Sequence, residues 1–225
     1  MTTLNVKAFA SLLILFLVIA GLIFAAAGTV RYWQGWTFLF VYFAASLAIT
    51  TDLMLRDRAL LERRMSGGPF AEREPTQRII MAIVAVCFIA LIVIPGLDHR
   101  WGWSAMSPLM AVIGDLLIIL GFAGFLLVFR ENSFAAATIG LAESQRVISS
   151  GPYAIVRHPM YASALLVLVG IPIALGSWWA LLVLTVILPV LIWRLRDEER
   201  FLVTNLSGYR DYREQVRYRL LPLIW

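Results

Sequence analysis

The stretch Gly151-Pro152-Tyr153-Ala154-Ile155-Val156-Arg157-His158-Pro159-Met160-Tyr161 contains Arg157, and the 36 residues between Arg157 and Arg194 form a run without Asp, Glu, Lys or Arg. As one helix, at about 1.5 Å per residue, the run would be far longer than a hydrocarbon core of about 30 Å. Gly176-Ser177 and Trp178-Trp179 lie near its middle. They predict a helical hairpin whose turn lies at one membrane interface.

A hairpin returns the chain to the side of the membrane that it left. Its start carries Arg157, His158 and Tyr161, and its end carries Arg194, Arg196, Glu198 and Glu199. We therefore expect these side chains to form one polar site at one membrane face.

The rest of the composition is also that of a membrane protein. Hydrophobic residues make up 61% of the 225 residues, against about half in an average soluble domain. Uncharged runs at 8–30, 32–51 and 79–97, and a fourth segment at about 107–129 with Asp115 as its one charge, are each long enough to span. The hairpin adds two short arms with Pro172 and Pro189. The fold class predicted is an all-α integral membrane protein with five to six membrane helices.

Two regions are expected, a transmembrane scaffold at 1–129 and a cofactor-binding region at 130–225. Ala25-Ala26-Ala27 resembles a signal-peptide cleavage site, but a second span follows almost at once, so a retained first helix is the simpler interpretation. An ionisable group such as Asp115 is costly inside a span, so the alternatives for it are a role in a substrate path, pairing with a polar neighbour, or a position near the outer interface.

Arginine is distributed unevenly along the chain. Sixteen of 18 Arg fall in 56–78, 130–157 and 194–219, which the positive-inside rule assigns to the cytoplasm. Both termini and the polar site are then cytoplasmic, and the net charge of +5 needs no nucleic-acid partner. The connection at 56–78, with its turn cluster Ser66-Gly67-Gly68-Pro69, is interpreted as a topology signal. The single Cys87 allows no internal disulfide and no cysteine-rich metal site, and is interpreted as a packing residue.

Val147-Ile148-Ser149-Ser150-Gly151-Pro152-Tyr153, then Arg157-His158-Pro159-Met160-Tyr161, then Glu198-Glu199, resembles the isoprenylcysteine carboxyl methyltransferase family and its phospholipid methyltransferase relatives. The resemblance covers roughly residues 125–225. It implies binding of S-adenosyl-L-methionine without a Rossmann domain, and it implies that Arg194 holds the substrate. The implied cofactor site consists of Gln145, Arg146, Val147, Ile148, Gly151, Tyr153, His158, Pro159, Met160, Tyr161, Glu198 and Glu199. Ser163 departs from the family pattern, which often has glycine there.

The chemistry of the residues supports this site independently of the resemblance. S-adenosylmethionine carries a sulfonium, an ammonium, a carboxylate, a ribose diol and an adenine. Glu198 or Glu199 can accept charge-assisted hydrogen bonds from the diol or the ammonium. Tyr153 and Tyr161 offer ring faces to a cation or to adenine, and His158 offers a donor. Arg194 and Glu198 are the predicted catalytic residues.

The acceptor is expected to be a lipid or lipid-linked molecule from the bilayer. A terminal carboxylate is ionised at neutral pH, so its methylation needs positioning by Arg194, with Asn132 as a second substrate contact, rather than a base. A phospholipid amine must first lose a proton, for which His158 or a glutamate is available. The sequence favours the carboxylate. An NADPH-dependent sterol-type reductase and a non-catalytic membrane adaptor are the alternatives from other classes.

Apolar residues at helical spacing follow Glu199, namely Phe201, Leu202, Leu206, Tyr209, Tyr212 and Val216. They predict an interfacial helix, broken at Ser207-Gly208, that partly covers the site.

Overall fold

The chain folds into helices throughout the residues that the structure describes. A computed structural model describes residues 3–67, 72, 74–135, 138–141, 145–222 and 224–225, and within them no strand occurs. The helices are α1 (Thr3–Ala27), α2 (Trp33–Arg56), α3 (Arg58–Met65), α4 (Pro75–Trp101), α5 (Pro108–Glu131), η1 (Gly151–Ala154), α6 (Pro159–Ala174), η2 (Trp179–Val183), α7 (Leu184–Asn205) and α8 (Tyr209–Gln215). The predicted all-α fold class is confirmed.

Five helical segments are long and apolar enough to cross a membrane. They are α1, α2, α4, α5 and the continuous segment Trp179–Asn205 that contains η2 and α7, and α6 is a shorter apolar helix. The protein is therefore a multi-pass helical membrane protein, as predicted. The expectation of two short hairpin arms is wrong for the second arm, because its helix continues past Arg194 to Asn205 without a break.

The hairpin turn is fixed by the neighbouring connection between α4 and α5. Gly176 has φ +75°, a backbone conformation that favours glycine. Asp98 accepts hydrogen bonds from the hydroxyl of Ser177, from the backbone N–H of Ser104 at 2.7 Å and from the Ser104 hydroxyl at 2.6 Å. A buried carboxylate with three donors pins the turn at one end of the bundle.

Helices α5 and α6 pack with their backbones in close approach. A Cβ atom at Gly114 would lie 2.1 Å from the backbone nitrogen of Ala174, and one at Gly124 would lie 2.3 Å from the Ser163 hydroxyl oxygen. Small residues allow this approach between membrane helices. Ser163 is compatible with this close packing, because Gly124 on α5 faces it.

The core lies where the long helices meet, and it includes Ile23, Phe38, Leu91, Ile118 and Ile171. The predicted packing role of Cys87 is confirmed, since the residue is buried in this core. Large apolar side chains such as Leu13, Leu17, Phe40, Val86 and Leu116 remain exposed. An outer surface of this kind suits contact with lipid.

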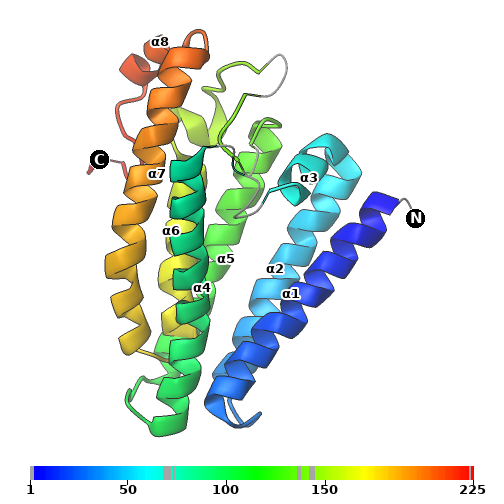
Figure 1. Ribbon diagram of the computed structural model, residues 1–225, viewed down its shortest axis with the longest axis vertical. Helices are drawn as coiled ribbons and strands as arrows, with labels where there is room; N and C mark the ends of the chain where they lie inside the picture. Colours follow the sequence, from blue (N-terminus) through cyan, green and yellow to red (C-terminus); the bar gives the residue numbers. More distant parts are fainter. Residues whose placement is uncertain (1–2, 68–71, 73, 136–137, 142–144, 223) are drawn as a thin grey trace.

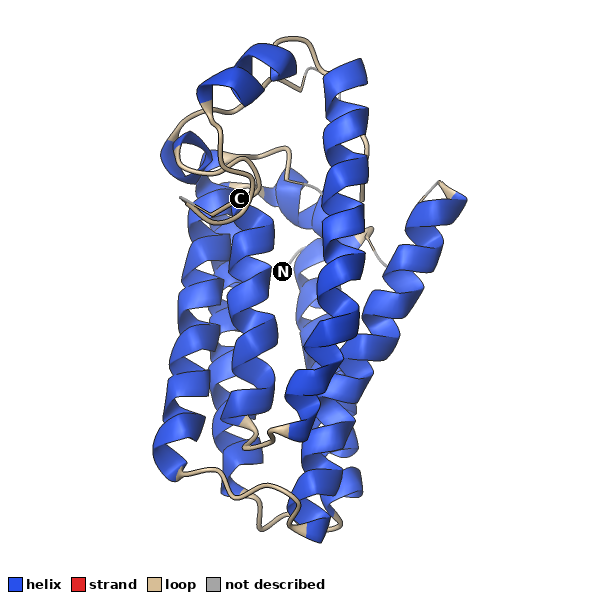
Figure 2. Cartoon of the chain, turned by 90° about the vertical axis from the view of Figure 1, so that its left-hand side faces the viewer, coloured by secondary structure: helices blue, strands red, loops and turns tan. Residues whose placement is uncertain are grey.

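The polar connections gather at one end of the bundle. Figure 1 shows α3 and α8 at the upper end, whereas the α4–α5 connection and the hairpin turn lie at the lower end. Figure 2 shows α8 and the C-terminal loops at the same upper end. The segment 56–78, interpreted as a topology signal, also contains α3, on which Leu60 and Leu61 are buried. Gly68 and Pro69 of its turn cluster lie outside the described residues.

Candidate active site

A cavity of about 100 Å³ lies at the end of the bundle that carries α8. Its walls come from the segment after α5, the segment before η1, the start of α6, the end of α7, and α8. Segments far apart in the sequence therefore meet here because α6 and α7 form a hairpin.

Eleven of the predicted site residues line this cavity: Asn132, Gln145, Arg146, Val147, Ile148, Tyr153, His158, Pro159, Met160, Tyr161 and Glu198. Gly151, Arg194 and Glu199 do not line it. The sequence motifs thus come together in one place, and three of their residues lie outside the cavity lining.

The local sequence explains how the motif residues are held. Pro159 occupies the first turn of α6, where proline is favoured because its missing N–H is not needed. Gly151 has φ +56°, and a Cβ atom there would lie 2.9 Å from a carboxylate oxygen of Glu131. Gly151 therefore shapes the turn that presents Tyr153 to the cavity, and this turn requires glycine.

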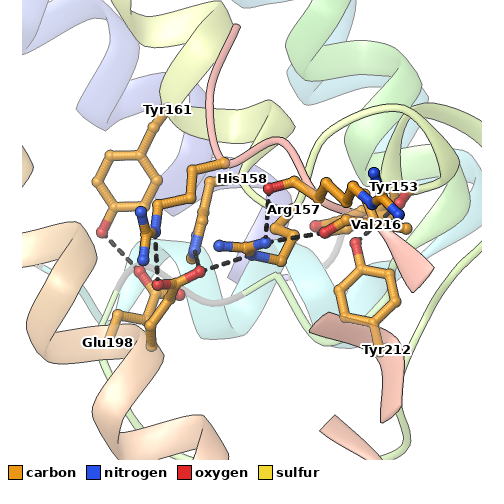
Figure 3. Close-up of polar contacts among 10 residues, drawn as sticks. Tyr153, Arg157, His158, Tyr161, Glu198, Tyr212 and Val216 are labelled. Carbon is orange, nitrogen blue, oxygen red and sulfur yellow. Dashed lines mark hydrogen bonds and ion pairs between the residues drawn. The ribbon is translucent and has the colours of Figure 1, made fainter. Parts of the chain in front are cut away.

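Three hydrogen bonds connect the polar side chains of the cavity. The hydroxyl of Tyr161 donates to Oε2 of Glu198 at 2.6 Å (Figure 3). The amide of Asn132 donates to the hydroxyl of Tyr153 at 2.8 Å. The hydroxyl of Tyr212 donates to the backbone oxygen of Tyr153 at 2.8 Å, as Figure 3 also shows. The cavity thus presents a carboxylate and aromatic rings in fixed orientations.

Burial, the largest cause, and the nearby carboxylate of Glu198 together raise the pKa of Tyr153 to about 12, although the hydrogen bond from Asn132 lowers it. The phenol is therefore protonated at neutral pH. Tyr153 can provide a ring face and a hydroxyl but not a base.

Glu199 lies in a buried ion cluster beside the cavity. Its carboxylate accepts from Nε of Arg157 at 2.7 Å and from Nε of Arg219 at 2.9 Å. Nε2 of His158 lies 3.4 Å from Oε1 of Glu199. Among the described residues, this nitrogen has no partner with hydrogen-bond geometry. The guanidinium of Arg157 also donates to the backbone oxygens of Val216 and Arg217. Glu199 therefore ties the start of α6 to the segment after α8.

Arg194 lies in a second buried cluster, and it is not part of the cavity lining. Its guanidinium donates to Oε1 of Glu72 at 2.6 Å and to Oε1 of Gln77 at 2.8 Å. Gln77 in turn donates to the carboxylate of Asp197. The partners of Arg194 thus come from the chain before and at the start of α4, more than 100 positions away.

Several cavity residues were missed by the sequence analysis. Tyr209 and Tyr212 were assigned to a covering helix, and both line the cavity; their apolar spacing with Phe201 and Leu202 was the available signal. Phe134 also lines the cavity. Glu72 could not be identified from the sequence, because no local pattern distinguishes it from other loop glutamates. Asp115 lines neither of the two described cavities.

The donor and acceptor set fits a nucleoside-like cationic cofactor. Glu198 supplies an anionic acceptor, and the tyrosines supply ring faces. The hydroxyl of Tyr209 is buried and has no hydrogen-bond partner among the described residues, so a bound polar group would satisfy it. Within the part of the chain that the structure describes, no three His, Cys, Asp or Glu side chains gather to hold a metal ion.

These features define a class of protein, a helical membrane protein with a ligand cavity at one end of the bundle. Residues 109–207 match the family described as phospholipid methyltransferase. The resemblance expected from the motifs is thereby confirmed for residues 109–207, which are similar to that family.

One curated relative is similar over part of the chain. The cobalt-zinc-cadmium resistance protein CzcN of Cupriavidus metallidurans is 29% identical over 137 residues. The match covers 57% of this chain and 56% of that protein, so it spans little more than half the length of the relative.

Proposed function

We propose that this protein is an S-adenosylmethionine-dependent membrane methyltransferase that esterifies a lipid-linked carboxylate of the isoprenylcysteine type. The observation that carries the proposal is the order of residues on α7. Glu198 faces the cavity and is held by Tyr161 at 2.6 Å, while Arg194 lies four residues earlier. Residues four apart lie on one face of a helix. A cofactor anchor and an acceptor anchor are thus adjacent.

The cofactor residues proposed are those of the motif that line the cavity. Glu198 would accept hydrogen bonds from the ribose diol or the ammonium group, and Tyr153 or Tyr161 would face the cation or adenine. Gly151 and Glu199 would act indirectly, by holding the η1 turn and the start of α6. When bound, S-adenosylmethionine supplies an electrophilic methyl group on a positively charged sulfur.

The acceptor residues proposed are Arg194 and Asn132. The guanidinium of Arg194 can hold a carboxylate through two parallel hydrogen bonds, which orients one oxygen for attack. One carbon–oxygen bond forms as the carbon–sulfur bond breaks, and the electron pair of that bond stays on sulfur. No proton has to move, so no base is needed, and the raised pKa of Tyr153 is compatible with this.

The site is proposed to face the cytoplasm. The connections that carry most of the arginines lie at the cavity end of the bundle, for example Arg63 on α3 and Arg213 on α8. An apolar lipid tail would reach the site from the bilayer along the exposed apolar helix faces. A cofactor made in the cytoplasm and an acceptor held in the membrane would then meet at one place.

A second candidate is N-methylation of a phospholipid amine. Two observations favour it: the matching family is described as phospholipid methyltransferase, and Arg194 is already paired with Glu72. A cationic headgroup would be attracted to carboxylates rather than to Arg194.

The two candidates are separated by methyl transfer from labelled S-adenosylmethionine to a farnesyl-cysteine analogue and, in parallel, to phosphatidylethanolamine. The proposal predicts a base-labile methyl ester. Its rate should be flat from about pH 6 to about pH 9, because the carboxylate is ionised throughout. A base-stable methylated amine lipid, formed at a rate that rises with pH, would establish the second candidate instead. Methyl transfer to neither acceptor would contradict both candidate functions.

A further inference from the structure

Glu72 is a buried glutamate that pairs with Arg194. Only 2% of this residue is exposed. One carboxylate oxygen pairs with Arg194 at 2.6 Å, and the other accepts the backbone N–H of Ile139 at 3.3 Å. Its backbone oxygen accepts from Nε of Arg78 at 2.8 Å. The carboxylate thus occupies the face of the guanidinium that an acceptor carboxylate would need.

A second cavity, of about 830 Å³, lies against this pair. Glu72 and Gln77, which both accept hydrogen bonds from Arg194, line this cavity, whereas Arg194 itself does not. Phe134, Ile139 and Phe201 line both cavities. The second cavity therefore adjoins the candidate cofactor cavity, and Glu72 lies between it and Arg194.

We propose that the second cavity receives the polar end of the acceptor, and that the acceptor's carboxylate exchanges with Glu72 on Arg194. This inference rests on the proposed carboxyl methylation. Removing a partner from a buried charge is costly, but replacing one carboxylate by another keeps Arg194 neutralised. Glu72 is then a specificity-determining residue, because a neutral or cationic acceptor cannot displace it.

The exchange also provides a route for product release. Methylation converts the acceptor carboxylate into an uncharged ester, which no longer neutralises Arg194. The carboxylate of Glu72 can then return to the guanidinium and displace the ester. Substrate entry and product exit would thus both follow from the charge of the group on Arg194.

The test compares Glu72→Gln with wild-type protein in detergent, using the farnesyl-cysteine acid as acceptor. Gln keeps the shape of Glu but removes the competing charge. The expected result is a KM for the acid that is lower by about tenfold, the effect of one charge-assisted hydrogen bond, with an unchanged KM for S-adenosylmethionine. The methyl ester should become a stronger inhibitor. Glu62→Gln, a change at an exposed residue of α3 outside both cavities, is the matched control and should leave both KM values unchanged.

An unchanged or raised KM for the acid in folded Glu72→Gln would overturn the inference and leave the proposed function intact. Wild-type protein that forms no ester at all would instead overturn the proposed function. Hydrogen exchange on wild-type protein tests the same point without a variant. Binding of the acid should speed exchange of the Ile139 amide, because Glu72 is displaced from it, and the methyl ester should not. Equal slowing by both ligands would contradict the exchange.

Discussion

The hydroxyl of Tyr161, in the first turn of α6, donates a hydrogen bond of 2.6 Å to the carboxylate of Glu198 on α7. The adjacent Glu199 carboxylate faces the other way, toward Arg157 and Arg219. Two neighbouring glutamates therefore have different surroundings, one at the cavity and one in a buried ion cluster. The difference gives them separate roles that mutation can distinguish.

Glu198→Ala should weaken binding of S-adenosylmethionine and leave thermal stability nearly unchanged. A lost charge-assisted hydrogen bond costs about 1.5 to 3 kcal/mol, which is roughly tenfold or more in affinity. Glu199→Gln should do the reverse, because removing one partner of a buried charge pair costs about 3 to 5 kcal/mol of stability. Calorimetry measures the affinities, and thermal unfolding in detergent measures the stabilities. Equal effects of the two changes would refute the division of roles.

Arg194→Lys should lower methyl transfer by roughly tenfold or more even though it conserves charge. A single ammonium group cannot reproduce the two-armed contact that the guanidinium makes with Glu72 and Gln77, or would make with a carboxylate. Affinity for S-adenosylmethionine should remain near the wild-type value. Arg196→Lys is the control, since Arg196 is exposed and stacks over Trp225. Full activity of Arg194→Lys would remove Arg194 from the acceptor site.

Gly114→Ala should destabilise the protein in detergent by about 1 to 3 kcal/mol or more, the usual cost of overpacking. A Cβ atom there meets the backbone of Ala174 at 2.1 Å, which a side-chain rotation cannot relieve. Gly21→Ala is the matched control in a membrane helix, because a Cβ atom at Gly21 meets nothing within 4 Å. The control should be neutral or slightly stabilising. Comparable melting temperatures for the two variants would show that α5 and α6 do not pack so closely.

Membrane orientation can be tested by cysteine labelling in a Cys87→Ser background. Exposed Ser66 and Ser207 lie at the cavity end of the chain, and exposed Ser107 precedes α5 at the opposite end. Ser66→Cys and Ser207→Cys should react only with a reagent applied from the cytoplasmic side, and Ser107→Cys only from the other side. The converse labelling would place the candidate site outside the cytoplasm.

The spans and the hairpin could be predicted because they depend on local properties. Uncharged runs report directly on membrane crossing, and Gly176-Ser177 marks the turn that the structure has at that position. The meeting of Tyr161 with Glu198 followed from the hairpin alone. The continuation of α7 to Asn205 was not predicted, because the residues after Glu199 were assigned to a separate interfacial helix.

Long-range contacts explain what the sequence analysis missed. Arg194 pairs with Glu72 across 122 positions, and no local pattern encodes that contact. The sequence analysis assigned both glutamates of the acidic pair to the cofactor. Neighbouring residues on a helix point about 100° apart, and only the packed structure shows which of the two carboxylates faces the cavity. Tyr209 and Tyr212 were predicted to cover the site, but their place in the cavity wall depends on how α8 folds back.

The most direct measurement for the account is titration of the purified protein in mild detergent with S-adenosylhomocysteine and, separately, with NADPH. S-adenosylhomocysteine, the product left after methyl transfer, should bind to a single site per chain. Tyr209→Phe should weaken this binding, because it removes the buried hydroxyl that a polar group of the ligand would satisfy. NADPH should give no heat of binding. Saturable binding of NADPH with no binding of S-adenosylhomocysteine would contradict the methyltransferase account and favour a reductase.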